Sequence, residues 1–155
     1  MAQSNQFRSG RHFLHIPGPS NVPDRVLRAI DRAIIDHRGP EFAEMAQGLI
    51  AGMQGVFGAS GPVIIFPSSG TGAWEAALVN TLSPGDRILM FETGQFATLW
   101  CRMAERLGLE VDWVAGDWRR GIDITLAEAR LGADTGHAVK AVMAVHNETS
   151  TGAVS

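Results

Sequence analysis

The sequence contains a single cysteine and a single lysine among its 155 residues. One cysteine, Cys101, excludes an internal disulfide and fits a reducing compartment, so we expect a cytoplasmic protein in which Cys101 is a small buried hydrophobe. The basic charge is carried almost entirely by arginine, because the only lysine is Lys140. Any chemistry that needs a lysine amine has only this residue to use within the chain.

Blocks of basic residues and long apolar runs are also missing. The net charge is −3, and no interleaving of basic and aromatic residues occurs, so nucleic acid is not a predicted partner. No apolar stretch approaches the length of a membrane span, and residues 1–12 are too polar for a signal peptide. With 45% hydrophobic and 19% charged residues, the chain is predicted to be globular and long enough for one ordinary domain.

The N-terminal part is predicted to begin extended and to continue as helix. Three prolines exclude a regular helix before about residue 22, so we assign residues 1–22 to an extended segment and 23–155 to one domain. Apolar residues at helical spacing then predict two helices, over 23–35 and 41–57. Gly58 is expected to end the second helix.

From residue 58 onward, strand and helix patterns alternate. The expected strands cover 63–66, 87–91, 109–114 and 138–145. The expected helices cover 71–82, 96–107 and 126–131, the second with Phe96, Leu99, Met103 and Leu107 aligned on one face. The last strand, AVKAVMAV, is apolar enough for burial on both faces. The alternation predicts an α/β fold with a mostly parallel sheet and helices on both faces.

The segment 66–77, FPSSGTGAWEAA, combines a strand end, a loop of small residues and a helix start. Ser69, Gly70 and Thr71 lie at its centre. Glycine permits close approach of the backbone to a ligand, hydroxyls add donors, and a helix N-terminus offers free N–H groups and partial positive charge. The turn therefore suits a phosphate. It matches neither the P-loop nor the dinucleotide fingerprint, so an ordinary strand-to-helix connection is the alternative interpretation.

Several further motifs follow one another along the chain. In order, they are PGPSNVP at 17–23, DHRGPEF at 36–42, SSGTGAWEAAL at 68–78, SPGDR at 83–87, GQF at 94–96 and HNETSTG at 146–152. In this order and at these spacings they resemble the N-terminal part of class V aminotransferases, most closely the serine–glyoxylate and alanine–glyoxylate enzymes. The resemblance implies the large domain of the aspartate-aminotransferase-like fold (fold type I), incomplete in this chain. It also implies pyridoxal 5′-phosphate as cofactor, an amino acid and a 2-oxo acid as substrates, and a homodimer or higher homo-oligomer.

The resemblance also implies roles for the residues of the small-residue turn and of the segment that begins at Gly94. Ser69, Gly70 and Thr71 would cradle the cofactor phosphate, and Phe96 would stack on the pyridine ring. Phe96 lies just beyond a strand end, where ligands bind in open α/β sheets. Periodicity alone favours a different interpretation, in which Phe96 is simply the first apolar residue of its helix.

The same resemblance assigns residues of the last loop and of the N-terminal segment. Thr149 would contact the phenolic oxygen of the cofactor, and Asn147 is a weaker candidate, because the related cysteine desulfurases offer a ligand role there. Glu148 is expected to order the loop. Gly18 and Asn21 would approach the substrate, because the family folds its N-terminal segment over the active site.

The lysine that forms the Schiff base in the family has no counterpart in this chain, so no catalytic residue is assigned. We interpret Lys140, in the middle of a predicted strand, as a structural or edge residue. The family's ring-nitrogen aspartate, its lysine and its substrate-binding arginine would follow Ser155. We therefore expect the N-terminal part of a longer or split transaminase, poorly stable and inactive alone. The strand at 63–66 would lack its neighbours and expose an apolar edge.

Two functional hypotheses follow. The first is a pyridoxal-phosphate transaminase that moves an amino group from serine or alanine to glyoxylate, with aspartate as donor or cysteine desulfuration as alternatives within the family. The second is a non-catalytic α/β module that binds a phosphorylated ligand or a partner chain, including the rest of its own chain. No metal site is predicted, because His12 and His15 lack a surrounding cluster of ligands. His146 is expected to be a hydrogen-bonded histidine at a strand end.

Overall fold

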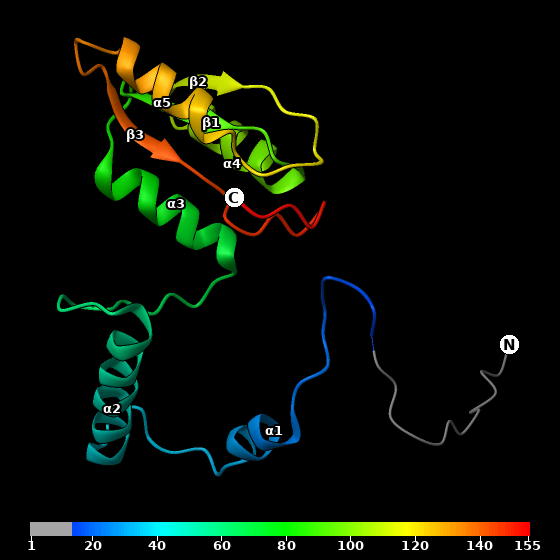
Figure 1. The fold of residues 1–155 in the computed structure, drawn as a ribbon. Coiled ribbons are helices and arrows are strands. Elements are labelled where there is room, and N and C mark those ends of the chain that lie inside the picture. Colours follow the sequence, from blue (N-terminus) through cyan, green and yellow to red (C-terminus); the bar gives the residue numbers. More distant parts are fainter. Residues whose placement is uncertain (1–13) are drawn as a thin grey trace, which may run out of the picture. The chain divides into compact units, whose positions relative to one another are not determined.

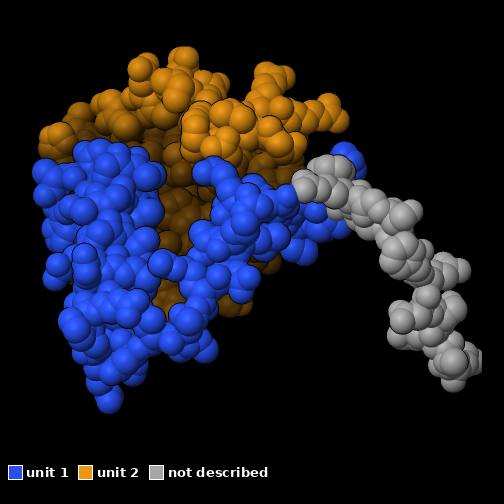
Figure 2. Space-filling view, turned by 90° about the horizontal axis from the view of Figure 1, so that it is seen from below, with its two compact units in different colours: residues 1–64 blue, residues 65–155 orange. Residues whose placement is uncertain are grey.

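The computed structural model describes residues 14–155, and the chain divides into two compact units, residues 1–64 and 65–155, coloured separately in Figure 2. The first thirteen residues of the predicted extended segment lie outside the described residues. The predicted domain boundary near residue 22 stays a prediction. In the part of the chain that the structure describes, no helix is both long enough and apolar enough to cross a bilayer.

The described residues of the first unit, 14–64, form two helices, α1 (Asp24–Ile30) and α2 (Pro40–Phe57). The predicted end of α2 is confirmed, because Gly58 adopts the left-handed conformation with φ of 60° that glycine tolerates best. The predicted extension of α1 to residue 35 is wrong, since the helix ends at Ile30. Neither helix has a buried residue. A helix whose apolar face is not packed against another element gains little stability from helix propensity alone.

The second unit is built on a three-stranded parallel sheet, as Figure 1 shows. Its strands are β1 (Arg87–Phe91), β2 (Glu110–Val114) and β3 (Val139–Met143), in the order β2-β1-β3. The unit begins with α3 (Gly70–Thr81), and α4 (Gln95–Arg106) and α5 (Ile124–Ala133) connect successive strands. The predicted α/β class with a parallel sheet is confirmed.

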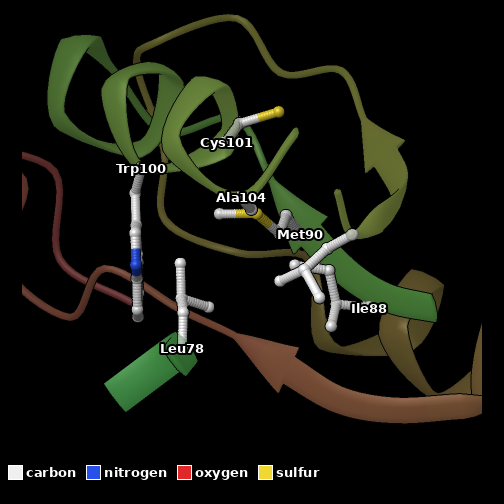
Figure 3. Close-up of a cluster of buried hydrophobic side chains, with 7 residues drawn as sticks. Leu78, Ile88, Met90, Trp100, Cys101 and Ala104 are labelled. Carbon is white, nitrogen blue, oxygen red and sulfur yellow. The ribbon is translucent and has the colours of Figure 1, made fainter. Parts of the chain in front are cut away.

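Helices cover both faces of this sheet. One buried cluster joins α3 and α4 to β1 and β2; Figure 3 labels Leu78, Ile88, Met90, Trp100, Cys101 and Ala104 from it. On the opposite face, Leu89, Phe91 and Val114 form a second cluster, against which Ala127 of α5 packs. Alternate residues of β1 therefore serve the two layers, as the period of a strand requires. Cys101 is a buried helix residue, as predicted.

The buried face of α4 overlaps only in part with the predicted one, because Met103 and Leu107 pack against the core and Leu99 does not. The residues that pack against the sheet are Ala97, Trp100, Cys101 and Ala104. Leu99 is exposed, although the pattern of large apolar residues placed it on the core face. Small residues at 97 and 104 let the helix approach β1 closely, so the contact surface lies about one position away from the row of large side chains.

The predicted strand at 63–66 is not formed. Ile64, Ile65 and Phe66 are exposed by 71%, 61% and 51%, and no described residue pairs with them. A strand needs a neighbour for its backbone N–H and C=O groups, so apolar β-branched residues alone do not make one. The expected exposed apolar segment is therefore present, but as an irregular chain.

The predicted burial of β3 on both faces is also wrong. Lys140 and Val142 are exposed, while their neighbours along the strand are half-buried. Among the described residues β3 forms an edge of the sheet, and its outer side has no neighbouring strand. The apolar run at 138–145 is therefore only partly covered.

Candidate functional site

Two of the predicted site segments meet at one edge of the sheet. A turn of three residues leads from the carboxyl end of β1 to α4, whose second residue is Phe96, and Asn147 and Thr149 lie in the loop after β3. Because β1 and β3 are parallel neighbours, their carboxyl ends point to the same end of the sheet. Ligands of open α/β sheets usually bind beyond the carboxyl ends of the strands.

The side chain of Glu148 connects these two segments. It is 1% exposed, and its carboxylate accepts hydrogen bonds from the N–H groups of Phe96 at 3.2 Å and Ala97 at 3.0 Å. It also accepts from the N–H of Ser150 at 3.2 Å and from its hydroxyl at 2.7 Å. The Ser150 hydroxyl accepts in turn from the N–H of Gln95 at 2.9 Å. The first N–H groups of α4 are thus satisfied by a loop about fifty residues away in sequence.

The carboxylate of Glu148 is held in its charged form. Burial by itself raises the pKa of Glu148, but the hydrogen bonds donated by Ser150, Ala97 and Phe96 outweigh it and bring the pKa below the ordinary value. The N-terminus of α4 adds partial positive charge beside the carboxylate. The predicted loop-ordering role of Glu148 is confirmed.

Gly94 is needed where it stands because Glu148 passes directly over it. A Cβ atom at Gly94 would lie 2.6 Å from the Cγ of Glu148 and 2.6 Å from the Oγ of Ser150. In the sequence Gly94 stands out only as part of the GQF motif, because the atoms that exclude a side chain come from the loop after β3.

The loop after β3 is ordered by its own backbone as well. Asn147 forms an antiparallel bridge with Val154, and the N–H of Glu148 donates to the carbonyl of Ala153 at 2.9 Å. The Thr151 hydroxyl donates to the carbonyl of Thr93 at 3.1 Å. Thr149 is exposed at the tip of this ordered turn.

His146 begins the same loop. Its Nδ1 lies 2.5 Å from the carbonyl oxygen of Ser155, so the prediction of a hydrogen-bonded histidine at a strand end is confirmed.

The start of α3 carries the predicted phosphate-binding residues. Ser69, Gly70 and Thr71 are exposed, and no side chain caps this helix N-terminus. The Ser68 side chain instead fills the space where a Cβ of Gly72 would stand. The N–H of Gly72 donates to the carbonyl of Ser69 at 3.0 Å. The other N–H groups of this helix start and the two exposed hydroxyls together suit an anion.

An aromatic contact joins α3 to α4 near these residues. Trp74, one turn into α3, meets the ring of Phe96 edge to face with centroids 6.1 Å apart. Trp74 also stacks on Trp100 of α4 at 5.0 Å. These contacts bring the start of α3 and the half-buried Phe96 to the same end of the unit.

Thr93 adds a polar group that sequence analysis missed. It is 1% exposed, and its hydroxyl has no hydrogen-bond partner among the described residues. Buried polar groups are normally paired, so an unpaired hydroxyl beside Gly94 is an observation that fits a ligand site. Its position directly after a strand end was the only available signal.

The contacts described above do not include the remaining predicted residues. Gly18 and Asn21 belong to the first unit, where the Asn21 side chain accepts from the N–H of Leu14 at 2.7 Å, and their substrate role stays a prediction. Lys140 is exposed in the amino-terminal half of β3, with its Nζ 3.4 Å from the carbonyl of His137, so its structural or edge assignment is confirmed. His12 lies outside the described residues, and residues 14–155 contain no cluster suited to a metal.

A hollow of about 270 Å³ lies beyond the ends of β1 and β2. Its charged groups are largely paired. Glu92 accepts from the indole N–H of Trp118 at 2.8 Å and from the N–H of Gly116 at 3.2 Å, and Arg120 lies 3.9 Å from Asp117. None of the predicted site residues lines this hollow.

Comparison with known proteins identifies related sequences. The family model described as Aminotransferase class-V matches residues 12–155. A serine–glyoxylate aminotransferase from Methylorubrum extorquens is 47% identical over 149 residues, which cover 96% of this chain and 37% of that protein. An L-aspartate–glyoxylate aminotransferase from Paracoccus denitrificans is 43% identical over 143 residues, covering 92% of this chain and 36% of the relative.

A solved structure shows the same fold. The alanine–glyoxylate aminotransferase from Nostoc sp. superposes with a TM-score of 0.82 at 28% identity, covering 99% of this chain and 40% of its own. The chain therefore spans little more than a third of the length of the curated relatives it matches. The predicted fold type I architecture is confirmed for this span.

Proposed function

The chain belongs to the aminotransferase class-V family, and we propose that it supplies one part of the cofactor site of a transaminase that uses pyridoxal 5′-phosphate. In this proposal the whole protein takes an amino acid and a 2-oxo acid and moves an amino group from serine or alanine to glyoxylate. Bound pyridoxal phosphate supplies the electron sink for a carbanion at the substrate Cα.

The observation that carries the proposal is the convergence of three features at one end of the second unit. The uncapped start of α3 offers N–H groups and the hydroxyls of Ser69 and Thr71 to a phosphate. The half-buried ring of Phe96 lies near this helix start, because it contacts the ring of Trp74 in α3. Glu148 accepts a hydrogen bond from the Phe96 N–H and so connects it to the loop that carries Thr149.

Each residue has a separate task in this proposal. Gly70, with the two hydroxyl residues beside it, binds the phosphate, and Phe96 orients the ring and excludes water from one side. Thr149 donates to the phenolic oxygen, with Asn147 as the weaker candidate for that contact. Gly18 and Asn21 contact the substrate, and a homodimer or higher homo-oligomer completes the site.

A binding experiment tests the cofactor assignment. Pyridoxal phosphate is titrated into the purified chain while tryptophan fluorescence is recorded, because all four tryptophans lie in residues 65–155. We expect quenching by pyridoxal phosphate and much weaker quenching by pyridoxal, which lacks the phosphate. Thr71→Val and Ser69→Ala should each weaken binding, whereas Asn80→Ala, at the far end of α3, should not. Equal binding of pyridoxal and pyridoxal phosphate would contradict the phosphate site.

A longer polypeptide tests the activity. The chain is joined to the region that follows the matched segment in the Methylorubrum relative, and glycine formation from glyoxylate is measured with serine, alanine or aspartate as donor. Faster turnover with serine or alanine supports the proposal. Preference for aspartate, which the Paracoccus relative uses according to its name, would replace the donor and retain the reaction class.

A second candidate function is a non-catalytic module that binds a phosphorylated ligand or a partner chain. The observation in its favour is Lys140, the only lysine, which lies in the amino-terminal half of β3, away from the carboxyl ends of the strands. Under this alternative the chain binds other phosphorylated small molecules as tightly as pyridoxal phosphate, and the joined polypeptide forms no glycine.

A further inference from the structure

We propose that Glu148 is a positioning residue, whose buried carboxylate holds Phe96 and Thr149 in one fixed arrangement. The inference rests on the proposed function for the identity of the ligand. The carboxylate of Glu148 is occupied by the N–H groups of Phe96 and Ala97 and by Ser150, so no contact with the cofactor is assigned to it. In this proposal Glu148 fixes the distance between the Phe96 ring and the Thr149 hydroxyl, which both contact the cofactor ring.

The hydrogen bonds of Glu148 divide between the two segments. One carboxylate oxygen accepts from the N–H of Phe96 and from Ser150, and the other accepts from the N–H of Ala97. Thr149 stands between Glu148 and Ser150, so both of its chain neighbours belong to this network. Any shift of the loop that moves Thr149 therefore stretches bonds to the first turn of α4.

Another carboxylate at a helix start shows what an ordinary cap does. Asp123 accepts from the N–H of Leu126 at 3.2 Å and so caps α5 from within three residues. Its loss affects the start of one helix. Glu148 acts across more than fifty residues, and its loss releases two segments from each other.

The site leaves little room for a substitute at position 148. Glutamine has nearly the same shape, but its amide nitrogen cannot accept a hydrogen bond, so at least one bond to Phe96, Ala97 or Ser150 is lost. Glu148 also lies so close to Gly94 that a Cβ atom there would meet its Cγ at 2.6 Å, which leaves the side chain little room to shift in that direction.

The experiment compares Glu148→Gln with Asp123→Ala in the full chain. For Glu148→Gln we expect about tenfold weaker binding of pyridoxal phosphate, the equivalent of one lost hydrogen bond to a charged group. Without ligand, amide hydrogen exchange should become faster in residues 94–98 and 146–152 together, while β1 and β2 stay protected. Asp123→Ala should accelerate exchange in α5 only and leave binding unchanged.

Ser150→Ala provides a milder variant if Glu148→Gln does not fold. It removes the hydroxyl between Gln95 and Glu148 but keeps the carboxylate, so we expect faster exchange in the same two segments and a smaller loss of affinity.

Several results would overturn the inference. These are unchanged affinity in Glu148→Gln, faster exchange in only one of the two segments, or an equal loss of affinity in Asp123→Ala. Failure of the unmodified chain to bind pyridoxal phosphate contradicts the proposed function instead. Exchange in the two segments then still shows whether Glu148 couples them.

Discussion

Helices α2 and α4 lie in different units of the chain and differ in what they pack against. α2 is 18 residues long and has apolar residues at helical spacing, yet none of its residues is buried. α4 has only 12 residues, but it buries four of them against a parallel sheet and has its first N–H groups bonded to Glu148. An apolar helix face contributes to stability only where another element covers it.

The same difference separates the candidate site residues. Ser69, Phe96 and Thr149 belong to a unit with two buried clusters, whereas Gly18 and Asn21 belong to a unit whose two helices bury nothing. A site needs supporting residues that hold its geometry, so the residues proposed to bind the cofactor are better supported by the fold than those proposed to bind the substrate.

The largest expected effect on stability comes from truncating one buried side chain in the core of the second unit. Leu78→Ala removes a side chain that is 1% exposed and should lower the free energy of unfolding by about 2–5 kcal/mol. Leu49→Ala in α2, where the side chain is 55% exposed, should change it by less than about 0.5 kcal/mol. Urea unfolding followed by tryptophan fluorescence and far-UV circular dichroism measures both. Similar losses in the two variants would contradict the contrast between the units.

Two glycine substitutions should act in opposite directions. Gly94→Ala places a Cβ against Glu148 and should destabilise the second unit by about 1–3 kcal/mol. Gly48→Ala in α2 meets no atom within 4 Å and should stabilise the helix by about 0.5–1 kcal/mol. Tryptophan fluorescence during unfolding reports the first change, and amide exchange in α2 reports the second. A stabilising Gly94→Ala would show that Glu148 does not occupy this space.

Two helix starts within the second unit allow a finer comparison. Asp123→Ala removes the side-chain cap of α5 and should cost about 1 kcal/mol. Ser69→Ala at the start of α3 removes no capping hydrogen bond, so its effect on stability should stay below about 0.5 kcal/mol. Thermal unfolding of both variants provides the measurement. A large loss of stability in Ser69→Ala would mean that its hydroxyl serves the fold and not a ligand.

The smallest expected effect is a pH dependence of the loop after β3. Because the pKa of Glu148 is lower in the folded chain, its contribution to stability is complete above the ordinary carboxyl pKa and is lost as the pH falls through the folded-state value. Amide exchange in residues 94–98 and 146–152, corrected for intrinsic rates, should therefore show loss of protection in acid. Glu148→Gln should remove this dependence, and its persistence in that variant would assign it to another group.

Local patterns predicted most elements of the second unit to within about two residues at each end. The predicted strand at 87–91 matches β1, and the helix at 71–82 matches α3 with a shift of one residue. These elements have neighbours that cover their apolar residues, so periodicity and packing agree. The predictions of a strand at 63–66 and of a helix that continues to residue 35 were wrong, because no other described residues cover the apolar side chains of these segments.

The candidate site was predictable only in part. Phe96 and Thr149 follow strand ends, and that signal is visible in a single sequence. Thr93 also follows a strand end, but nothing in the sequence shows that its hydroxyl is buried without a partner. The space requirement at Gly94 has no local signal, because the atoms that cause it come from the loop after β3, more than fifty residues away.

The amino-acid sequence by itself determined the class of fold, the order of strands and helices in residues 65–155, and the small-residue turn at Ser69–Thr71. These properties depend on the periodicity of neighbouring residues and on the conformations that glycine and proline allow. Only the tertiary structure decided that Glu148 joins α4 to the loop after β3, that Ala97, Trp100, Cys101 and Ala104 form the buried face of α4, and that β3 lies at an edge of the sheet among the described residues. Each of these depends on which distant segments meet, and pairing over long sequence separation leaves no periodic trace in the chain.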